Sequence, residues 1–241
     1  MGQAVHAFAP SGDKSEPAGF SAGAGPYPLE RCGTVWKTRL MLILASQSAT
    51  RKDLLTGAGL SFAAHPAEID ERAVENTLAA SGASAGEIAC HLAIAKAAAV
   101  AAHFPAAVVI GADQVLSLGE TRLHKPASLL EAGAQLDLMR GRVHYLHTGV
   151  AIVCEGRLQW SHVATAAMTM RNFSARERDA VLAVEGEAVL GSVGGYLLEG
   201  PSIRLFESIE GDYFSILGLP LLPMLGALRH YAPNVFEEEI A

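Results

Sequence analysis

Residues 143–170 read VHYLHTGVAIVCEGRLQWSHVATAAMTM, and this stretch decides the class of fold. Apolar and β-branched residues fill both halves, and Glu155-Gly156 between them is typical of a tight turn. We therefore expect two long strands, Val143–Val153 and Leu158–Met170, joined as a hairpin. Because a hairpin pairs its strands antiparallel, a sheet that contains this one is not wholly parallel.

Strand and helix patterns alternate along the chain on both sides of the hairpin. Three helices should begin at Ser84, Ser128 and Ser174, because each serine stands three residues before a glutamate, which is the capping-box pattern. The first two should end near His103 and Gly141. The other predicted elements are helices at Arg51–Ala58 and Leu219–Tyr231 and strands at Leu42–Ala45, Ala107–Leu118, Val193–Leu198 and Ile203–Ile209. Together they predict a mixed α/β fold with a partly antiparallel sheet flanked by helices.

The composition bounds the class of protein. The chain has 241 residues, half of them apolar, which suits one large domain or two closely packed lobes with a sizeable core. Its formal net charge of −7 argues against binding to nucleic acid or to an anionic membrane surface. No apolar run reaches the roughly 18 residues that a membrane-spanning helix needs. The three cysteines, Cys32, Cys90 and Cys154, are too far apart for a usual zinc site, and so sparse a set fits a reducing cytoplasm.

The two ends of the chain differ from the rest. Residues 1–38 are rich in Gly, Pro, Ala and Ser without an apolar period, so we interpret them as a disordered N-terminal extension that lacks the pattern of a secretory signal. Met41 opens the first strand, and translation starting near it is a hypothesis that the intact mass of the native protein would test. We expect a folded domain over residues 41–231 and an acidic C-terminal tail over residues 232–241.

Basic and hydroxyl residues suggest where an anion would bind. Residues 42–55 read LILASQSATRKDLL, a strand followed by hydroxyl residues and a helix that opens with basic side chains. A helix N-terminus attracts phosphate, Ser46 would add a donor, and Arg51 would add a fork that matches phosphate oxygens. By itself this pattern is more often a serine cap beside exposed basic residues. Lys96 in an alanine-rich helix and Lys125 before a proline are individually typical of surface lysines, but with Arg51 they would supply local positive charge.

Carboxylates stand out at three places. Asp113 directly follows the apolar strand VVIGA, and a carboxylate there caps a turn, binds a metal or activates water, because burying it unpaired is costly. Gly111 in that strand would let a ligand approach the backbone. Glu68-Ile69-Asp70-Glu71 would offer oxygen ligands to a hard cation, although such a run is more often a solvated loop or helix start. Glu199 in GGYLLEG has a role in base recognition or near a metal, or lies in an ordinary turn.

Two histidines lie close together in the sequence, at positions 144 and 147. Three residues apart on a strand, His144 and His147 point to opposite faces of the sheet. A chelating pair is therefore disfavoured, and core or surface histidines are the better interpretation.

An ordered set of segments resembles the Maf family of nucleotide pyrophosphatases. The resemblance covers Leu42 to about Arg229, and its segments occur in the order LASQSATRKDLL, EIDER, LAIAKA, VIGADQV, HKP, LMRGRVHYLHTGVAI and YLLEGPSIRLFESIEGDYFSILGLP. It implies a mixed α/β fold with two lobes around a cleft, and commonly a homodimer. It also implies hydrolysis of a nucleoside triphosphate to a monophosphate and pyrophosphate with a divalent cation, Mg²⁺ or Mn²⁺.

The resemblance also implies roles for individual residues of this chain, at the positions that match the family's functional positions. The resemblance implies that Asp113 is the catalytic carboxylate, as general base or as activator of a metal-linked water. The positions that match the family's phosphate-binding residues are Ser46, Arg51, Lys96 and Lys125. The positions that match its acidic, metal-holding segment are Asp70 and Glu71, with Asp113.

The chain departs from the family pattern beside Arg51. The family usually shows two adjacent arginines there, or in one subgroup a tryptophan ahead of them, whereas this chain has Thr50-Arg51 followed by Lys52, so phosphate binding would be partly relayed to Lys52. Gln114 and Glu199 match the subgroup that prefers 7-methyl-GTP, while the subgroup that prefers UTP and dTTP shows Thr and Gln at these positions. Thr50 fits neither subgroup. We expect Thr50, Gln114 and Glu199 to contact the substrate, with the preference leaning to 7-methyl-GTP.

Two other functions stay open at this point. The first is a non-enzymatic regulator of cell division that binds a nucleotide, because the family's naming links it with septum formation. The second is a house-cleaning hydrolase for deaminated purines such as ITP, which shares the reaction but not this set of motifs. Hydrolysis and a substrate panel separate them.

Overall fold

A computed structural model of the protein describes residues 40–236. The predicted extension over residues 1–38 and residues 237–241 of the predicted acidic tail lie outside this range. Within it, the strands are β1 (Leu42–Leu44), β2 (Ala63–Ala64), β3 (Val108–Leu118), β4 (Thr121–Leu123), β5 (Val143–Cys154), β6 (Arg157–Met170) and β7 (Phe206–Glu210). The helices are α1 (Ala49–Gly57), α2 (Glu71–Ala80), α3 (Ala85–Ala101), α4 (Leu129–Met139), α5 (Ala175–Glu185), α6 (Tyr213–Ile216) and α7 (Leu221–Tyr231). Short 3-10 helices are η1 (Gly186–Gly191), η2 (Pro201–Leu205) and η3 (Pro233–Phe236).

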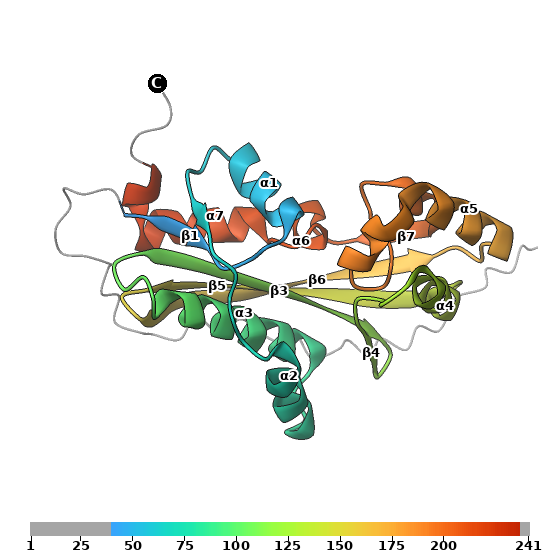
Figure 1. Ribbon diagram of the computed structural model, residues 1–241, viewed down its shortest axis with the longest axis horizontal. Helices are drawn as coiled ribbons and strands as arrows, with labels where there is room; N and C mark the ends of the chain where they lie inside the picture. The colour runs from blue at the N-terminus through green and yellow to red at the C-terminus, as the bar shows by residue number, and fades with distance from the viewer. Residues whose placement is uncertain (1–39, 237–241) are drawn as a thin grey trace, which may run out of the picture.

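The strands form one mixed sheet in the order β2-β1-β3-β5-β6-β7, with β4 also paired to β3. β1 is parallel to β2 and β3, whereas β3, β5, β6 and β7 are successively antiparallel. The predicted hairpin is confirmed, because β5 and β6 pair directly across Glu155-Gly156, and both turn residues have positive φ, as tight primed turns require. The mixed α/β class is therefore confirmed (Figure 1).

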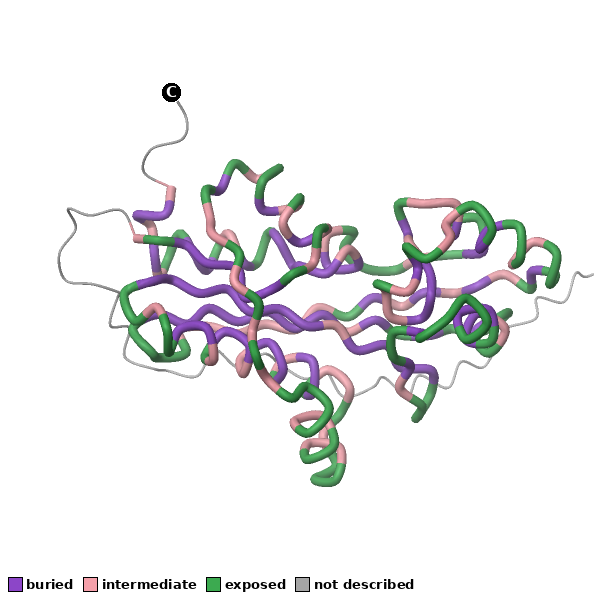
Figure 2. Tube along the Cα trace, viewed as in Figure 1, coloured by how far each residue is buried: buried purple, intermediate pink, exposed green. Residues whose placement is uncertain are grey.

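Helices cover both faces of the sheet (Figure 1). α3 packs on one face, and α1, α6 and α7 lie on the other. The buried strands and α3 contrast with α2, which projects from the body and has no buried residue within the described range (Figure 2). None of the helices in residues 40–236 has the length and apolarity to span a membrane.

The capping predictions hold with one difference. Ser84 and Ser174 form complete capping boxes at the starts of α3 and α5. Ser128 caps α4 by accepting from the Glu131 backbone N–H, but the Glu131 carboxylate accepts from the Ala127 backbone instead of completing the box. The predicted helix starts are thus confirmed.

The predicted strand at Val193–Leu198 is wrong. The described chain forms no strand there, and Gly194 and Gly195 have positive φ, which breaks an extended run. The apolar residues that suggested a strand are buried instead in a loop, since Tyr196 and Leu198 belong to a hydrophobic cluster. The predicted strand at Ile203–Ile209 begins too early, because Pro201 opens η2 and β7 starts at Phe206.

Strand β3 carries the feature that positions the site. β5 pairs along one edge of β3, while β1 pairs with Val108–Ile110 and β4 with Leu116–Leu118 on the other edge. Between the β1 and β4 pairings, residues 111–115 of β3 have no neighbouring strand on that second edge within the described chain. The gap opens beside Asp113 and Gln114, whose side chains point to opposite faces of the sheet because they are adjacent on a strand.

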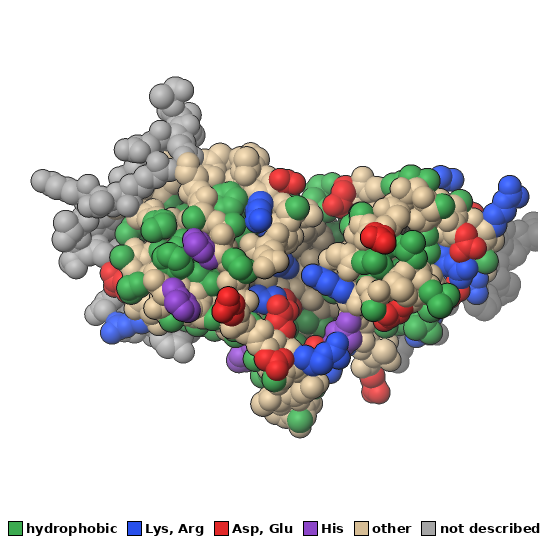
Figure 3. Space-filling model, viewed as in Figure 1, with side chains coloured by type: hydrophobic (Ala, Val, Ile, Leu, Met, Phe, Trp, Pro, Cys, Tyr) green, Lys and Arg blue, Asp and Glu red, His purple; other side chains and the backbone are tan. Residues whose placement is uncertain are grey.

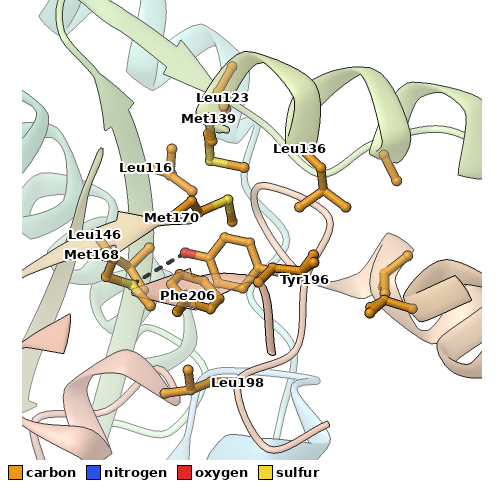
Figure 4. Close-up of a cluster of buried hydrophobic side chains, with 14 of the residues drawn as sticks. Leu116, Leu123, Leu136, Met139, Leu146, Met168, Met170, Tyr196, Leu198 and Phe206 are labelled. Atoms are coloured by element: carbon orange, nitrogen blue, oxygen red, sulfur yellow. Dashed lines mark hydrogen bonds between the residues drawn. The ribbon is translucent and has the colours of Figure 1, made fainter. Parts of the chain in front are cut away.

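Two hydrophobic clusters flank this gap. One lies at the β1 end of β3 with α1 and α7, and the other lies at the β4 end with α4 and α5. The second cluster includes Tyr196 and Phe206, whose rings meet edge to face beside Met168 (Figure 4). The gap in the sheet thus falls between two separately packed ends. A formal division into two lobes stays a prediction.

Candidate active site

A cleft of about 940 Å³ opens at the gap in the sheet. Figure 3 shows basic and acidic side chains gathered around the hollow near the middle of this face. Its walls come from the β1–α1 turn, α2, α3, the middle of β3, the segment after β4, the loop after η1 and the end of α6. The predicted site residues that line it are Ser46, Thr50, Arg51, Glu71, Lys96, Asp113, Gln114, Lys125 and Glu199.

Asp113 and Lys96 form the buried centre of the cleft. Lys96 Nζ lies 2.5 Å from Asp113 Oδ1 and 2.9 Å from Glu71 Oε1. Asp113 is 7% exposed and Lys96 is 8% exposed. Burial raises the pKa of Asp113, and the positive charges of Lys96 and Arg51 oppose this shift. A partly desolvated carboxylate held next to cations in a cleft is suited to accept a proton.

Two glycines bring α3 close enough for this contact. A Cβ on Gly111 would lie 2.1 Å from the Ala93 carbonyl oxygen, and one on Gly149 would lie 2.3 Å from that of Ala89. The α3 backbone rests directly on β3 and β5 at these two glycines, because a Cβ at either position would clash with it. The space beside Gly111 is therefore filled by helix α3 and is not available to a ligand, which corrects the expectation from sequence.

The β1–α1 turn forms the anion-binding wall. Ser48 caps α1, and its side chain accepts from the Arg51 backbone N–H. Arg51 is 9% exposed, donates through Nε to the Gly218 carbonyl at 2.8 Å, and donates through a terminal nitrogen to Ser46 Oγ at 3.2 Å. Burial lowers its pKa, opposed by Asp113 and Glu71, but a guanidinium stays charged at physiological pH. A rigid cation thus lies beside the open N-terminus of α1.

The remaining predicted residues divide into two groups. Lys125 and Glu199 are exposed at the cleft wall, and Thr50 is half-buried there. Asp70 is not among the described residues that line the cleft, because its carboxylate caps α2 by accepting from the Ala73 backbone N–H at 2.9 Å. Lys52 also lies outside the cleft lining, so the structure does not bring it to the phosphate side.

The Gln114 amide is held by three acceptors. Its Nε2 lies 3.1 Å from Thr148 Oγ1, 3.2 Å from the Ser215 carbonyl and 3.0 Å from the Ile216 carbonyl. The Thr148 hydroxyl donates its proton to the Ser215 carbonyl, so toward Gln114 it can only accept. All three neighbours of the Gln114 amide are therefore acceptors, and only its NH₂ group can face them. The amide anchors α6 to the sheet, and Gln114 Oε1 is left toward the Gly218 side of the cleft.

The loop that carries Glu199 is anchored on both sides. Upstream, the Tyr196 hydroxyl lies 3.0 Å from His144 Nε2 and donates to Met168 Sδ in the buried cluster (Figure 4). Downstream, the Glu185 carboxylate accepts from the Ser202 backbone and hydroxyl at 2.7 and 2.6 Å. The Glu199 backbone is therefore held in place, while its exposed carboxylate forms no hydrogen bond or ion pair with residues 40–236.

Sequence reasoning missed several residues at the rim. Arg72, Glu75 and His124 line the cleft, and Glu75 accepts from Arg122 Nε at 2.8 Å and lies 3.8 Å from His124 Nδ1. Glu71 and Glu75 are four residues apart and share a face of α2. That spacing was the available signal, but α2 was not predicted as a helix.

The cleft carboxylates meet part of what a divalent cation needs. Within residues 40–236 no group of three or more His, Cys, Asp and Glu side chains is placed to hold a metal ion. Glu71 and Asp113 nevertheless converge on one point, since both contact Lys96 Nζ. Mg²⁺ is usually held by one or two carboxylates together with substrate phosphates. Two oxygen ligands beside an anion-binding wall fit that type of site.

Comparison with known proteins agrees with this geometry. The family described as Maf-like protein matches residues 41–231. A 7-methyl-GTP pyrophosphatase of Rhizobium etli is 50% identical over 192 residues, which cover 78% of this chain and 94% of that protein. One of Rhizobium meliloti is 52% identical over 189 residues, covering 78% and 95%. A nucleoside triphosphate pyrophosphatase of Nitrobacter winogradskyi is 50% identical over 195 residues, covering 81% and 96%. The resemblance found in the sequence is confirmed: the chain belongs to the Maf family.

Proposed function

We propose that the protein is a nucleoside triphosphate pyrophosphatase that hydrolyses its substrate to a monophosphate and pyrophosphate, with a preference for 7-methyl-GTP. The observation that carries this proposal is the buried Asp113–Lys96 pair in a cleft that is also lined by Arg51 and the N-terminus of α1. The similarity to relatives named 7-methyl-GTP pyrophosphatase and nucleoside triphosphate pyrophosphatase supports it.

The cleft supplies the charge that a triphosphate needs despite the acidic chain. A triphosphate carries about four negative charges, and its hydrolysis depends mainly on positioning and charge neutralisation. Arg51, Lys96 and Lys125 provide the cations, and Ser46 and the α1 backbone provide neutral donors. In this proposal these groups hold the phosphates so that the α-phosphorus faces Asp113.

Asp113 acts in this proposal as the general base. Its carboxylate removes a proton from the attacking water, the oxygen of that water bonds to the α-phosphorus, and the bond to the bridging oxygen breaks to release pyrophosphate. The raised pKa of Asp113 strengthens it as a base. Glu71 and Asp113 would hold a divalent cation, which when bound neutralises phosphate charge and makes a bound water more acidic. We include this metal requirement, with Mg²⁺ or Mn²⁺, in the proposal.

The base preference rests on charge and on Glu199. Methylation at N7 gives the guanine ring a positive charge, and the exposed Glu199 carboxylate complements that charge. A carboxylate also accepts hydrogen bonds from base amino groups. Gln114 contributes only its carbonyl oxygen, because its NH₂ group is engaged with α6.

The experiment is a substrate panel. Pyrophosphate release is measured from 7-methyl-GTP, GTP, UTP, dTTP and ITP with Mg²⁺ or Mn²⁺ and with a chelator. Cation-dependent release fastest from 7-methyl-GTP supports the proposal in full. Faster release from UTP or dTTP keeps the reaction and removes the role given to Glu199, and faster release from ITP indicates a deaminated-purine hydrolase. A folded protein that is stabilised by nucleotides but hydrolyses none contradicts the enzymatic function and favours the regulator.

We also propose that the protein is a cytoplasmic homodimer, in keeping with the family resemblance. Its mass in solution by light scattering tests the oligomeric part, and a monomeric mass at working concentration contradicts it.

A further inference from the structure

The Lys96 ammonium occupies the point on which the two cleft carboxylates converge. It lies 2.5 Å from Asp113 Oδ1 and 2.9 Å from Glu71 Oε1. The Lys96 and Asp113 side chains are each 11% exposed, whereas the Glu71 side chain is 54% exposed. One positive charge therefore contacts both carboxylates and offsets part of their combined negative charge from a partly desolvated position.

A divalent cation that used Asp113 Oδ1 and Glu71 Oε1 would need the same place. Two cations do not share a pair of carboxylate oxygens at these distances, because their mutual repulsion is strongest where solvent is excluded. The described residues also offer no third His, Cys, Asp or Glu ligand at this point. Protein groups alone are thus a weak site, and further oxygen ligands must come from phosphates.

Lys96 can change partners more readily than Arg51. Arg51 is held by a backbone carbonyl and by Ser46, both of which belong to the scaffold. The partners of Lys96 within residues 40–236 are carboxylates. Its four-carbon stem lets the ammonium turn toward another anion while α3 stays fixed on Gly111 and Gly149. Nucleotide phosphates entering the cleft are such an anion.

We propose that Lys96 is a placeholder cation: in the nucleotide-free protein it occupies the divalent-cation position between Glu71 and Asp113, and it gives up that position only when nucleotide phosphates attract it and supply further ligands. Metal binding is then coupled to nucleotide binding, and the free protein is protected from retaining a cation without substrate. This inference rests on the metal requirement in the proposed function.

The experiment measures Mn²⁺ binding without turnover. Binding to the nucleotide-free protein is followed by the electron paramagnetic resonance signal of free Mn²⁺. Lys96→Gln removes the placeholder and should bind Mn²⁺ about tenfold or more tightly than the wild type, because one competing charge is lost from a low-dielectric position. Lys125→Gln is the matched control, since Lys125 lines the same cleft but forms no ion pair among the described residues, and its Mn²⁺ affinity should stay unchanged. Adding Glu71→Gln to Lys96→Gln should reverse the gain.

Two results would overturn the inference. One is Mn²⁺ binding to Lys96→Gln that is no tighter than to the wild type. The other is obtained with the wild type alone, and so remains available if Lys96→Gln fails to fold. It uses a GTP analogue with a methylene bridge between the α- and β-phosphates, and the contradicting result is that protein and analogue together bind no more Mn²⁺ than the sum of what each binds alone. Neither measurement uses hydrolysis, so failure of the pyrophosphatase activity is detected separately.

Discussion

The stability of this fold should fall in mild acid because of one buried histidine. His144 on β5 is fully buried, its Nε2 lies 3.0 Å from the Tyr196 hydroxyl, and its Nδ1 has no hydrogen-bond partner among the described residues. Burial lowers its pKa from 6.5 to about 4. Burial also raises the pKa of Tyr196, so both members of the pair are neutral near pH 7.

The sign and size of the effect follow from proton linkage. As pH falls below 6.5, the unfolded chain protonates this histidine while the folded chain does not, so the free energy of unfolding declines between pH 6.5 and 4 and is unaffected above that window. The difference of about 2.5 pKa units corresponds to a loss of about 3 kcal/mol when the window has been crossed. Such a loss is a large part of a typical domain's stability.

The test compares urea unfolding at pH 7.5, 6 and 5 for the wild type and His144→Gln. Glutamine keeps a donor near the Nε2 position but does not titrate, so the variant should lose less stability than the wild type on acidification. His147 and His162 also have pKa values lowered by burial, but they are present in both proteins and cancel in the comparison. Exposed His103→Gln is the control and should behave as the wild type. Equal acid sensitivity in His144→Gln and the wild type would refute the reasoning.

Three further predictions concern the cleft. Gly111→Ala should lower the unfolding free energy by about 1–3 kcal/mol and reduce turnover, because the added Cβ forces α3 and Lys96 away from β3. The control Gly57→Ala, whose added Cβ meets nothing within 4 Å, should do neither, and melting temperatures and pyrophosphate release check both variants. Arg51→Gln should lower kcat/KM by about 10- to 100-fold through loss of charged hydrogen bonds, while Lys52→Gln should leave it near the wild type, and equal effects would contradict the assignment of the anion-binding wall. Glu199→Gln should reduce the preference for 7-methyl-GTP over UTP by about tenfold, and an unchanged ratio of kcat/KM values would remove Glu199 from base recognition.

Local patterns predicted the parts of the fold that local chemistry determines. Glu155-Gly156 and the serine caps at Ser84 and Ser174 act within a few residues, so their sequence signals were sufficient. The apolar run at Val193–Leu198 was misread, because burial of Tyr196 in a distant cluster produces the same pattern as a strand. Helix α2 was missed although Val74 and Leu78, four residues apart, form an apolar stripe that packs partly buried against the cluster beneath α3.

The candidate site shows the same limit. Asp113 was visible as a carboxylate directly after an apolar strand, and Arg51 as a cation after a serine cap. Their meeting with Lys96 depends on a gap between β1 and β4 and on the contact of α3 with two glycines. These are contacts between residues far apart in the chain, and no local pattern reports them. Asp70 illustrates the reverse case, since a helix cap and a metal ligand look alike in sequence.

Asp113→Asn tests the central claim most directly. The variant should keep the wild-type melting temperature, because Lys96 retains its contact with Glu71 and asparagine has nearly the same shape as aspartate. Pyrophosphate release from 7-methyl-GTP under saturating substrate and Mg²⁺ should fall by about 100-fold or more, since the general base is lost while the phosphate-binding residues remain. Release close to the wild-type rate, by a variant with an unchanged melting temperature, would contradict the assignment of Asp113 as the base and with it the proposed mechanism.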